Sequence, residues 1–461
     1  MASSPLLFTV RRFQPELVLP AAPTPREVKL LSDIDDQQGL RFNIPLIFIY
    51  RYEPSMAGRD PVEVLRNALS KTLVYYYPLA GRIKEGVGRK LMVDCTGEGV
   101  MFVGAEADVT LDQFGDSLQP PFPCFQELLY DVTGSELIID RPIRLIQVTR
   151  LSCGGFIVVI SWNHTSGDAA GLKQFMNAWA EIARGTHQPS IQPVWHRELL
   201  MARDPPHITC SHREYKQILQ SNNTIKEEET TTTIVHQSFF FKPSDIARIR
   251  LLVPFHLSQC TTFDLITACF WYCRTKALQL KPEEEVRMMV IANARSRFSA
   301  KHSSFVGYYG NCFAFPAALT TAGKLCGNSL GYALELIRKV KDEVTEEYIQ
   351  SVADFMVINE RCLFTTVNSC IISDLTRAKF REVNFGWGEG VYGGVAKGGA
   401  GPFPGITYIV PHKNAKGEEC MMLPICLPSK VMKRFAKELD EILHSQNYPT
   451  TSVSSFVKST L

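Results

Sequence analysis

Short apolar runs alternate with helical patterns along the first 190 residues. Runs rich in valine and isoleucine predict five strands: "PLIFIY" at 45–50, "KLMVD" at 90–94, "GVMFV" at 99–103, "RLIQVTR" at 144–150 and "FIVVISW" at 156–162. Asp60 as N-cap, Pro61 at the first helical position and Glu63 mark the start of a helix. A second helical pattern follows residue 168, so His164 is predicted to end a strand and Asp168 to lie in the turn before a helix.

The stretch from 186 to 233 is rich in proline and polar residues and shows little periodicity, which indicates a long crossover. We place a linker at 191–233, between an N-terminal domain at 1–190 and a C-terminal domain at 234–461. The segments with strand or helix patterns after the linker are "QSFFF" at 237–241, a helix from 262 to 274, "RMMVIAN" at 287–293, helices near 329–341 and 429–443, and "CMMLPIC" at 420–426. Strands and helices in both halves predict an α/β fold with a sizeable sheet in each domain.

Composition narrows the class of protein. The chain has 461 residues, and 49 Lys and Arg against 47 Asp and Glu give a net charge of +2 with no basic stripe, which argues against nucleic-acid binding. No apolar stretch approaches the roughly 18 residues of a membrane span. The start has its apolar run before the arginines, the wrong order for a secretory signal, and the final "STL" is a poor peroxisomal signal. Thirteen scattered cysteines indicate reduced thiols rather than a zinc site. We therefore expect a cytoplasmic protein without a metal.

The stretch "SWNHTSGDAAG" at 161–171 is the first candidate for chemistry. A histidine at the end of a strand, before a glycine-containing turn, can hold its imidazole at a cavity wall. As a neutral base, His164 could accept the proton of an alcohol that attacks a carbonyl. The alternative is a hydrogen-bonded histidine with a purely structural role.

Two other motifs suggest different chemistry. "FGDSLQP" at 114–120 could present Ser117 as the nucleophile of one class of serine hydrolases, but no apolar strand precedes it and prolines follow it, so a polar loop is favoured. "GEGVYGGVAKGGAG" at 388–401 is glycine-rich but lacks the Gly-Lys-Ser/Thr ending of a phosphate-binding loop. It is predicted to be a flexible or tightly turning connector.

Several motifs together resemble those of the plant BAHD acyltransferases, which move acyl groups from coenzyme A thioesters. These motifs are "YYYPLAGR" at 75–82, "HTSGD" at 164–168, "NARSRF" at 293–298, "GYYGN" at 307–311 and "NFGWG" at 384–388. Four further stretches, "QPELVLPAAPTP", "LSDIDDQQGLRF", "LMVDCTGEGVMFV" and "ARDPPHIT", are similar to the branch of benzyl alcohol O-benzoyltransferases and alcohol acyltransferases. The resemblance covers nearly the whole chain.

This resemblance implies a fold and a reaction. The fold would be two domains like chloramphenicol acetyltransferase, with mixed sheets, a solvent channel between them and some strand exchange near 370–410. His164 would lie in the channel and act as the general base, without a metal or a permanent cofactor. The loop residues Gly167 and Asp168 would support it, with Asp168 turned away from the channel and paired with a basic residue. Acyl-CoA would be the co-substrate and a small alcohol the acceptor, in a monomeric enzyme.

The remaining site residues also follow from the resemblance. The structural motif is Asn384, Phe385, Gly386, Trp387 and Gly388; the family usually has Asp where this chain has Asn384, and the arginine partner of that Asp is best matched by Arg295. A helix N-terminus at Thr261 or Thr262 could face coenzyme A, or the residue could simply cap the helix. The acceptor pocket would include Ser373, Leu375 and Arg377.

Hydroxycinnamoyl transferases tend to carry Trp where this chain has Leu375, which favours a smaller, more apolar alcohol. Benzoyl-CoA and benzyl alcohol are the leading substrates. The alternatives are acetyl-CoA or another short acyl-CoA with an aliphatic alcohol, and an aromatic acyl-CoA with a monolignol-like alcohol. From other classes, a serine hydrolase that uses Ser117 and a non-catalytic acyl-CoA-binding protein stay open.

Overall fold

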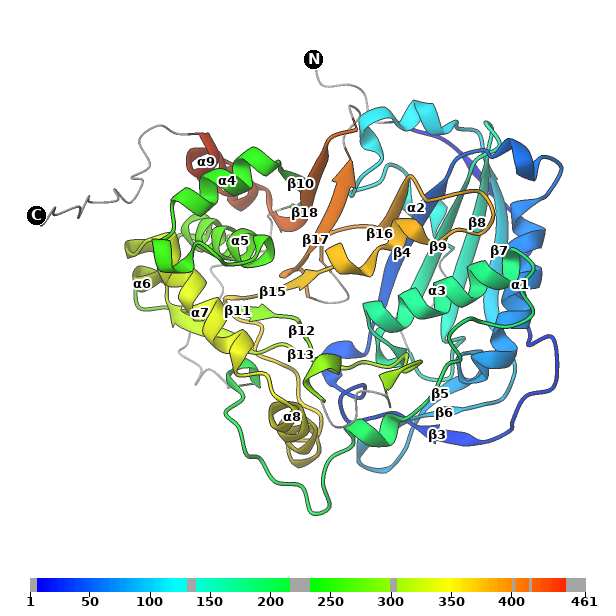
Figure 1. The fold of residues 1–461 in the computed structure, drawn as a ribbon, viewed down its shortest axis with the longest axis horizontal. Coiled ribbons are helices and arrows are strands. Elements are labelled where there is room, and N and C mark those ends of the chain that lie inside the picture. The colour runs from blue at the N-terminus through cyan, green and yellow to red at the C-terminus, as the bar shows by residue number, and fades with distance from the viewer. Residues whose placement is uncertain are drawn as a thin grey trace, which may run out of the picture.

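The computed structural model describes residues 6–130, 138–215, 233–298, 305–399, 403–413 and 417–444, without the side chains of residues 116 and 117. Figure 1 shows two lobes, each built on a large twisted sheet with helices against it. Each lobe has its own apolar core. No helix in the described ranges is long and apolar enough to cross a membrane.

The first large sheet is mixed and has the strand order β1-β7-β8-β9-β4-β16, with β2 beside β7. Its strands are β1 (Val10–Arg12), β2 (Glu16–Val18), β4 (Asn43–Tyr50), β7 (Val100–Ala107), β8 (Arg144–Leu151), β9 (Phe156–Asn163) and β16 (Tyr392–Val395). Helices α1 (Pro61–Tyr75) and α3 (Ala169–Ala183) pack against each other, and Figure 1 shows them on one side of this sheet. Apolar residues of both helices join the core under β4, β8 and β9. The predicted strands at 45–50, 99–103, 144–150 and 156–162 and both predicted helices are confirmed.

The predicted strand at 90–94 belongs to a separate small sheet. This sheet consists of β3 (Val28–Leu30), β6 (Leu91–Asp94) and β5 (Arg82–Glu85) in that order. A short helix, α2 (Phe125–Leu128), precedes β8 in the chain.

The second large sheet has the order β10-β18-β17-β15-β11-β14. Its strands are β10 (Ile234–Phe241), β11 (Glu285–Val290), β14 (Ala317–Thr321), β15 (Ser369–Asp374), β17 (Ile406–Lys413) and β18 (Glu419–Pro428). The helices beside it are α4 (Pro243–Leu251), α5 (Thr262–Leu278), α6 (Ala322–Gly327), α7 (Leu330–Asp342) and α9 (Ser429–His444). The patterns at 237–241, 262–274, 287–293, 329–341, 420–426 and 429–443 therefore give the expected elements. Helix α8 (Glu346–Ile358) and the short pair β12 (Ala292–Asn293) and β13 (Phe313–Ala314) complete the fold.

Strand β16 corrects one expectation. The glycine-rich stretch at 388–401 is not only a connector, because Tyr392–Val395 pairs antiparallel with β4 and closes the edge of the first sheet. Gly393 makes this possible, since a Cβ there would lie 2.9 Å from the backbone carbon of Phe380. A segment late in the chain thereby completes a sheet formed by early segments.

The domain limits stay a prediction. Residues 191–215 of the expected linker form an irregular connection with two 3₁₀ turns, at Arg197–Leu200 and Arg213–Tyr215. Residues 216–232 of the linker, and 445–461 of the expected C-terminal domain, lie outside the described residues.

Candidate active site

A cavity of about 830 Å³ lies where the two sheets meet, and both halves of the chain line it. Ile44, Leu46 and Trp162 contribute from β4 and β9, and Tyr408 and Met421 from β17 and β18. The cavity also brings together most of the residues singled out in the sequence: His164, Gly167, Asp168, Thr261, Thr262, Arg295, Ser373, Leu375 and Arg377. A larger cavity of about 1160 Å³, lined by Arg51, Lys242 and Arg381 among others, does not include His164.

His164 follows the last residue of β9 and begins a single 3₁₀ turn, His164–Ser166. The side chain of Asn163 caps this turn by accepting hydrogen bonds from the backbone nitrogen of Thr165 at 3.1 Å and from its hydroxyl at 2.6 Å. The backbone nitrogen of His164 donates to the carbonyl of Phe42 at 3.0 Å. The imidazole packs between two aromatic rings, with its centroid 5.4 Å from that of Phe42 and 5.9 Å from that of Phe313.

The two ring nitrogens of His164 have different surroundings. Nδ1 is buried, whereas Nε2 keeps solvent access, so Nε2 is the nitrogen available to a molecule in the cavity. Burial lowers the pKa of His164 below its ordinary value of 6.5, against smaller opposing effects of its own backbone carbonyl, the charge of Asp168 and the side chain of Asn311. The imidazole is therefore neutral at pH 7 and can accept a proton.

The hydrogen-bond partners of Asp168 are not those of a carboxylate in a catalytic relay. Its carboxylate caps α3 by accepting from the backbone nitrogens of Ala170 and Gly171, at 3.1 and 3.0 Å. It also accepts two hydrogen bonds from the guanidinium of Arg295, at 2.7 and 3.0 Å, and one from the backbone nitrogen of Cys312 at 3.1 Å. Burial pushes the pKa of Asp168 up, but the charge of Arg295 and these hydrogen bonds outweigh it, so the pKa lies below its ordinary value. The Asp168 carboxylate thus ties the loop after β9 to the opposite half of the chain.

The expected pairing of Arg295 with Asn384 is wrong. Arg295 lies in the 3₁₀ turn Arg295–Arg297, and its guanidinium donates hydrogen bonds to Asp168 instead. The side-chain oxygen of Asn384 instead accepts from the backbone nitrogens of Gly386 at 2.8 Å and Gly388 at 3.0 Å, and its backbone carbonyl accepts from Arg184. The "NFGWG" segment is a tight turn, in which Gly386 and Gly388 have φ values of 115° and 77° that favour glycine.

The rings of this second motif are buried in the N-terminal core. Phe385 packs edge-on against Trp179 with centroids 5.0 Å apart, and Trp387 packs against Phe156 at 5.1 Å. The hydroxyl of Tyr50 donates to the carbonyl of Val383, just before the motif, at 3.0 Å. No residue of 384–388 lines the cavity that holds His164. In this structure the motif instead packs the segment that precedes β16 against the core of the first sheet.

Thr261 caps helix α5 in a reciprocal arrangement with Asp264. Its hydroxyl accepts from the backbone nitrogen of Asp264 at 3.2 Å and donates to the carboxylate at 2.7 Å. Lys341 pairs with the same carboxylate and also lines the cavity. The capping role of Thr261 is therefore confirmed, while a contact of Thr261 or Thr262 with coenzyme A stays a prediction.

The residues expected to form the acceptor pocket lie in or just after a strand of the second sheet. Ser373 lies in β15, Leu375 follows that strand, and Arg377 lies in the next 3₁₀ turn, Thr376–Ala378. Sequence reasoning missed Phe42 and Phe313, which flank the imidazole, because single aromatic residues carry no local signal for a cavity. Asp35 and Asn311 lie in segments that carry the family resemblance, but the sequence alone gives these two residues no role.

The fold and this cavity define a two-lobed acyltransferase architecture, and comparison with known proteins gives the family. The transferase family matches residues 8–442, and the chain belongs to this family, that of the BAHD acyltransferases.

Two relatives cover almost the whole chain. The benzyl alcohol O-benzoyltransferase of Petunia hybrida is 58% identical over 442 residues, 96% of this chain and 95% of the relative. The 13-hydroxylupanine O-tigloyltransferase of Lupinus albus is 54% identical over 446 residues, 96% of each.

Two solved structures share the fold. Vinorine synthase superposes with a TM-score of 0.71 at 19% identity, covering 94% of this chain and 98% of its own. TRI101 of F. sporotrichioides, solved with coenzyme A and T-2, gives a TM-score of 0.66 at 16% identity, covering 89% and 97%.

Proposed function

We propose that the protein transfers an acyl group from an acyl-CoA thioester to the hydroxyl of a small alcohol, with His164 as the general base. The observation that carries this proposal is the neutral imidazole, whose Nε2 is open to a cavity between the two lobes while its Nδ1 is buried. Acyl-CoA is a co-substrate that is consumed at each turnover and leaves as free coenzyme A, and the presence of coenzyme A in the TRI101 structure supports this assignment.

The reaction needs one proton to move twice. Nε2 of His164 takes the hydroxyl proton as the alcohol oxygen attacks the thioester carbon, which forms the C–O bond of a tetrahedral intermediate. Collapse of that intermediate breaks the C–S bond, and the imidazolium returns the proton to the departing coenzyme A thiolate. The products are an ester and free coenzyme A thiol.

We propose benzoyl-CoA and benzyl alcohol as the preferred pair. Apolar and aromatic side chains make up most of the lining of the cavity that holds His164, among them Phe313, Leu375 and Phe380. The 58% identity to a benzyl alcohol O-benzoyltransferase supports the same pair. Acetyl-CoA or another short acyl donor with an aliphatic alcohol, and an aromatic donor with a monolignol-like alcohol, are the alternatives.

Roles for the other lining residues follow from their positions. Ser373, Leu375 and Arg377 are assigned to the acceptor side, and Gly167 and Asp168 to the support of the catalytic loop. Thr261 and Thr262 are assigned to the donor side, since the start of α5 opens on the cavity beside Lys341. We further propose that the enzyme acts as a cytoplasmic monomer, which size-exclusion chromatography and cell fractionation test.

The test is release of free thiol across a matrix of acyl-CoAs and alcohols. The wild-type protein is expected to release thiol only when both substrates are present, fastest with benzoyl-CoA and benzyl alcohol. His164→Ala is expected to lower kcat by about 10²- to 10⁴-fold without loss of folding. His187→Ala, at an exposed histidine that does not line the cavity, is the matched control, and its kcat should be unchanged. Near-normal turnover by folded His164→Ala would contradict the proposal.

The hydrolase alternative has its own outcome in the same assay. The backbone of Ser117 lies in the 3₁₀ helix Leu111–Ser117, and its side chain is outside the described structure. A hydrolase would release thiol without an alcohol and would lose activity on Ser117→Ala or with a serine-reactive phosphonate. An acyl-CoA-binding protein would bind the thioester and release no thiol.

A further inference from the structure

The larger of the two cavities described above, of about 1160 Å³, is a second cleft between the lobes. It shares no lining residue with the cavity that holds His164. The first lobe contributes Arg51, just after β4, and the 3₁₀ helix Leu111–Ser117, and the second lobe contributes the ends of β10 and β17. The proposed reaction uses none of these residues.

The segment around β16 separates this second cleft from the catalytic cavity. Phe380 lines the catalytic cavity, whereas the next residue, Arg381, lines the second cleft. Strand β18 shows the same division, with Met421 in the catalytic cavity and Cys420 in the second cleft. Strand β16 pairs with β4 and also contacts β17, between the two lobes (Figure 1). A molecule in the second cleft would therefore touch both lobes without entering the catalytic cavity.

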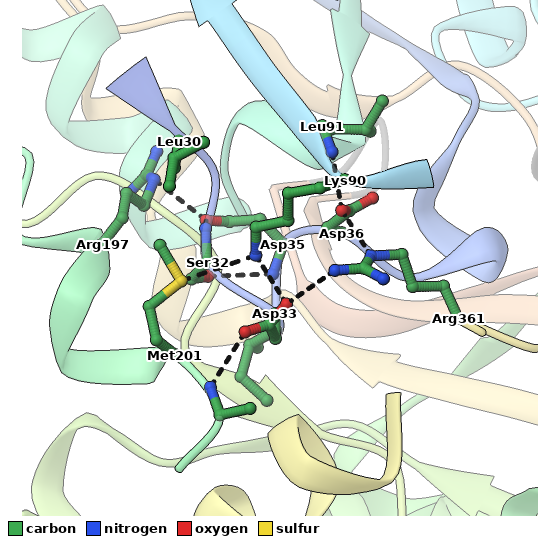
Figure 2. Close-up of polar contacts among 12 residues, drawn as sticks. Leu30, Ser32, Asp33, Asp35, Asp36, Lys90, Leu91, Arg197, Met201 and Arg361 are labelled. Atoms are coloured by element: carbon green, nitrogen blue, oxygen red, sulfur yellow. Dashed lines mark hydrogen bonds and ion pairs between the residues drawn. The ribbon is translucent and has the colours of Figure 1, made fainter. Parts of the chain in front are cut away.

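Arg381 presents an unpaired guanidinium to the second cleft. Its Nε donates to the backbone carbonyl of Gly390 at 3.1 Å, and the backbone nitrogen of Gly390 donates to the carbonyl of Arg381 at 2.8 Å. Among the described residues, its two terminal nitrogens have neither a hydrogen-bond partner nor a carboxylate. Arg361, by contrast, bonds Asp36 through Nε at 2.6 Å and Asp33 through a terminal nitrogen at 3.0 Å (Figure 2). Two free, parallel N–H donors on a held guanidinium match the two oxygens of a carboxylate.

The remaining cations of the second cleft differ in their partners. Arg51 pairs with Asp112 at 3.6 Å, and Lys413 pairs with Glu419 at 3.4 Å. Lys242, which follows β10, has no ion pair within the described ranges. Lys242 and Arg381 are therefore the cations of this cleft that can neutralise an incoming anion.

Aromatic and apolar side chains line the cleft beside these charges. The rings of Phe240 and His412 pack against each other with centroids 5.2 Å apart, and Leu118 and Val391 add apolar surface. Burial and the nearby charge of Arg381 lower the pKa of His412, so its imidazole is neutral at pH 7. The same effect shows that the guanidinium of Arg381 lies close to this pair of rings. The cleft thus offers a flat ring a partner of matching shape, next to a site for one negative charge.

We propose that the second cleft binds a small aromatic carboxylate, whose carboxylate group pairs with Arg381 and whose ring lies against Phe240 and His412. A concave space with apolar walls and a few convergent polar groups is typical of small-molecule sites. A phosphate is disfavoured, because Asp112, Glu418 and Glu419 also line the cleft and oppose a doubly charged group more strongly than a singly charged one. The site depends neither on His164 nor on the proposed function.

Titration calorimetry with benzoate tests this proposal on the full-length protein. Arg381→Met should weaken benzoate binding by about ten- to a hundredfold, as expected for the loss of a charged hydrogen-bonding partner. Arg377→Met is the matched control, because Arg377 is an exposed arginine that lines the catalytic cavity instead. It should leave benzoate binding unchanged. Benzamide, which has the ring without the charge, and inorganic phosphate, which has charge without a ring, should both bind at least tenfold more weakly than benzoate.

Four results of the titration would overturn the proposal. They are no binding of benzoate, unchanged binding by Arg381→Met, weaker binding by Arg377→Met alone, and equal binding of benzamide or phosphate. If Arg381→Met does not fold, wild-type crystals soaked in 4-iodobenzoate decide the question through the anomalous signal of iodine. A peak beside Phe240 and His412 would support the proposal, and a peak only elsewhere, or none, would overturn it.

Discussion

Asp168→Ala separates a structural carboxylate from a catalytic one. The change removes the cap of α3, which costs about 1 kcal/mol on its own. It also leaves Arg295 as a buried charge without its partner, and the side chain of Arg295 is only 15% exposed. Breaking a buried pair in this way costs about 3–5 kcal/mol. Because the two effects overlap, we expect the free energy of unfolding to fall by about 3–5 kcal/mol in total.

Urea unfolding followed by tryptophan fluorescence measures this loss, with kcat recorded per folded molecule. The double variant Asp168→Ala/Arg295→Met removes both charges and should recover about 2 kcal/mol relative to Asp168→Ala. Asp112→Ala, at an exposed pair with Arg51, should leave the stability unchanged. If Asp168→Ala keeps wild-type stability and loses activity as completely as His164→Ala, then Asp168 takes part in the chemistry and the structural role is refuted.

Two further substitutions test the second motif and the acceptor pocket. Asn384→Asp should leave kcat within twofold and the melting temperature unchanged or slightly raised, because a carboxylate can accept the same hydrogen bonds from Gly386 and Gly388; a collapse of activity measured by thiol release would show a direct role in the reaction. Leu375→Trp should reduce the space in the cavity and raise KM for benzyl alcohol more than for ethanol, by about tenfold; equal changes for the two alcohols would place Leu375 away from the acceptor.

Local signals predicted the elements that hold His164. The cap at Asp60 and the helical spacing after residue 168 depend on near neighbours in the chain, and the structure shows α1 and α3 where these signals lie. Strand β9 begins with an unbroken apolar run, residues 156–160, that is buried on both faces, and the sequence shows this run directly. The end of such a strand is a fixed point, so His164 could be placed from sequence.

Contacts between distant segments could not be predicted in this way. Half of strand β16 is glycine, and the strand pairs with β4 about 345 residues earlier, so neither its composition nor its period indicates a strand. The sequence suggested Asn384 as the partner of Arg295 and named no particular partner for Asp168, and only the three-dimensional position of the turn at Arg295 selects Asp168. The contact of Asn311 with Asp35 spans 276 residues and depends on both loops being buried together.

The pH dependence of kcat/KM tests the role of His164 most directly. Burial lowers the pKa of His164, and the base must be neutral, so activity should be retained as the pH falls through 6.5 and should be lost only below that value. A single acid limb centred below 6.5, and absent from the residual activity of His164→Ala, is the predicted result. A limb centred above 6.5, or one that persists unchanged in His164→Ala, would contradict the account.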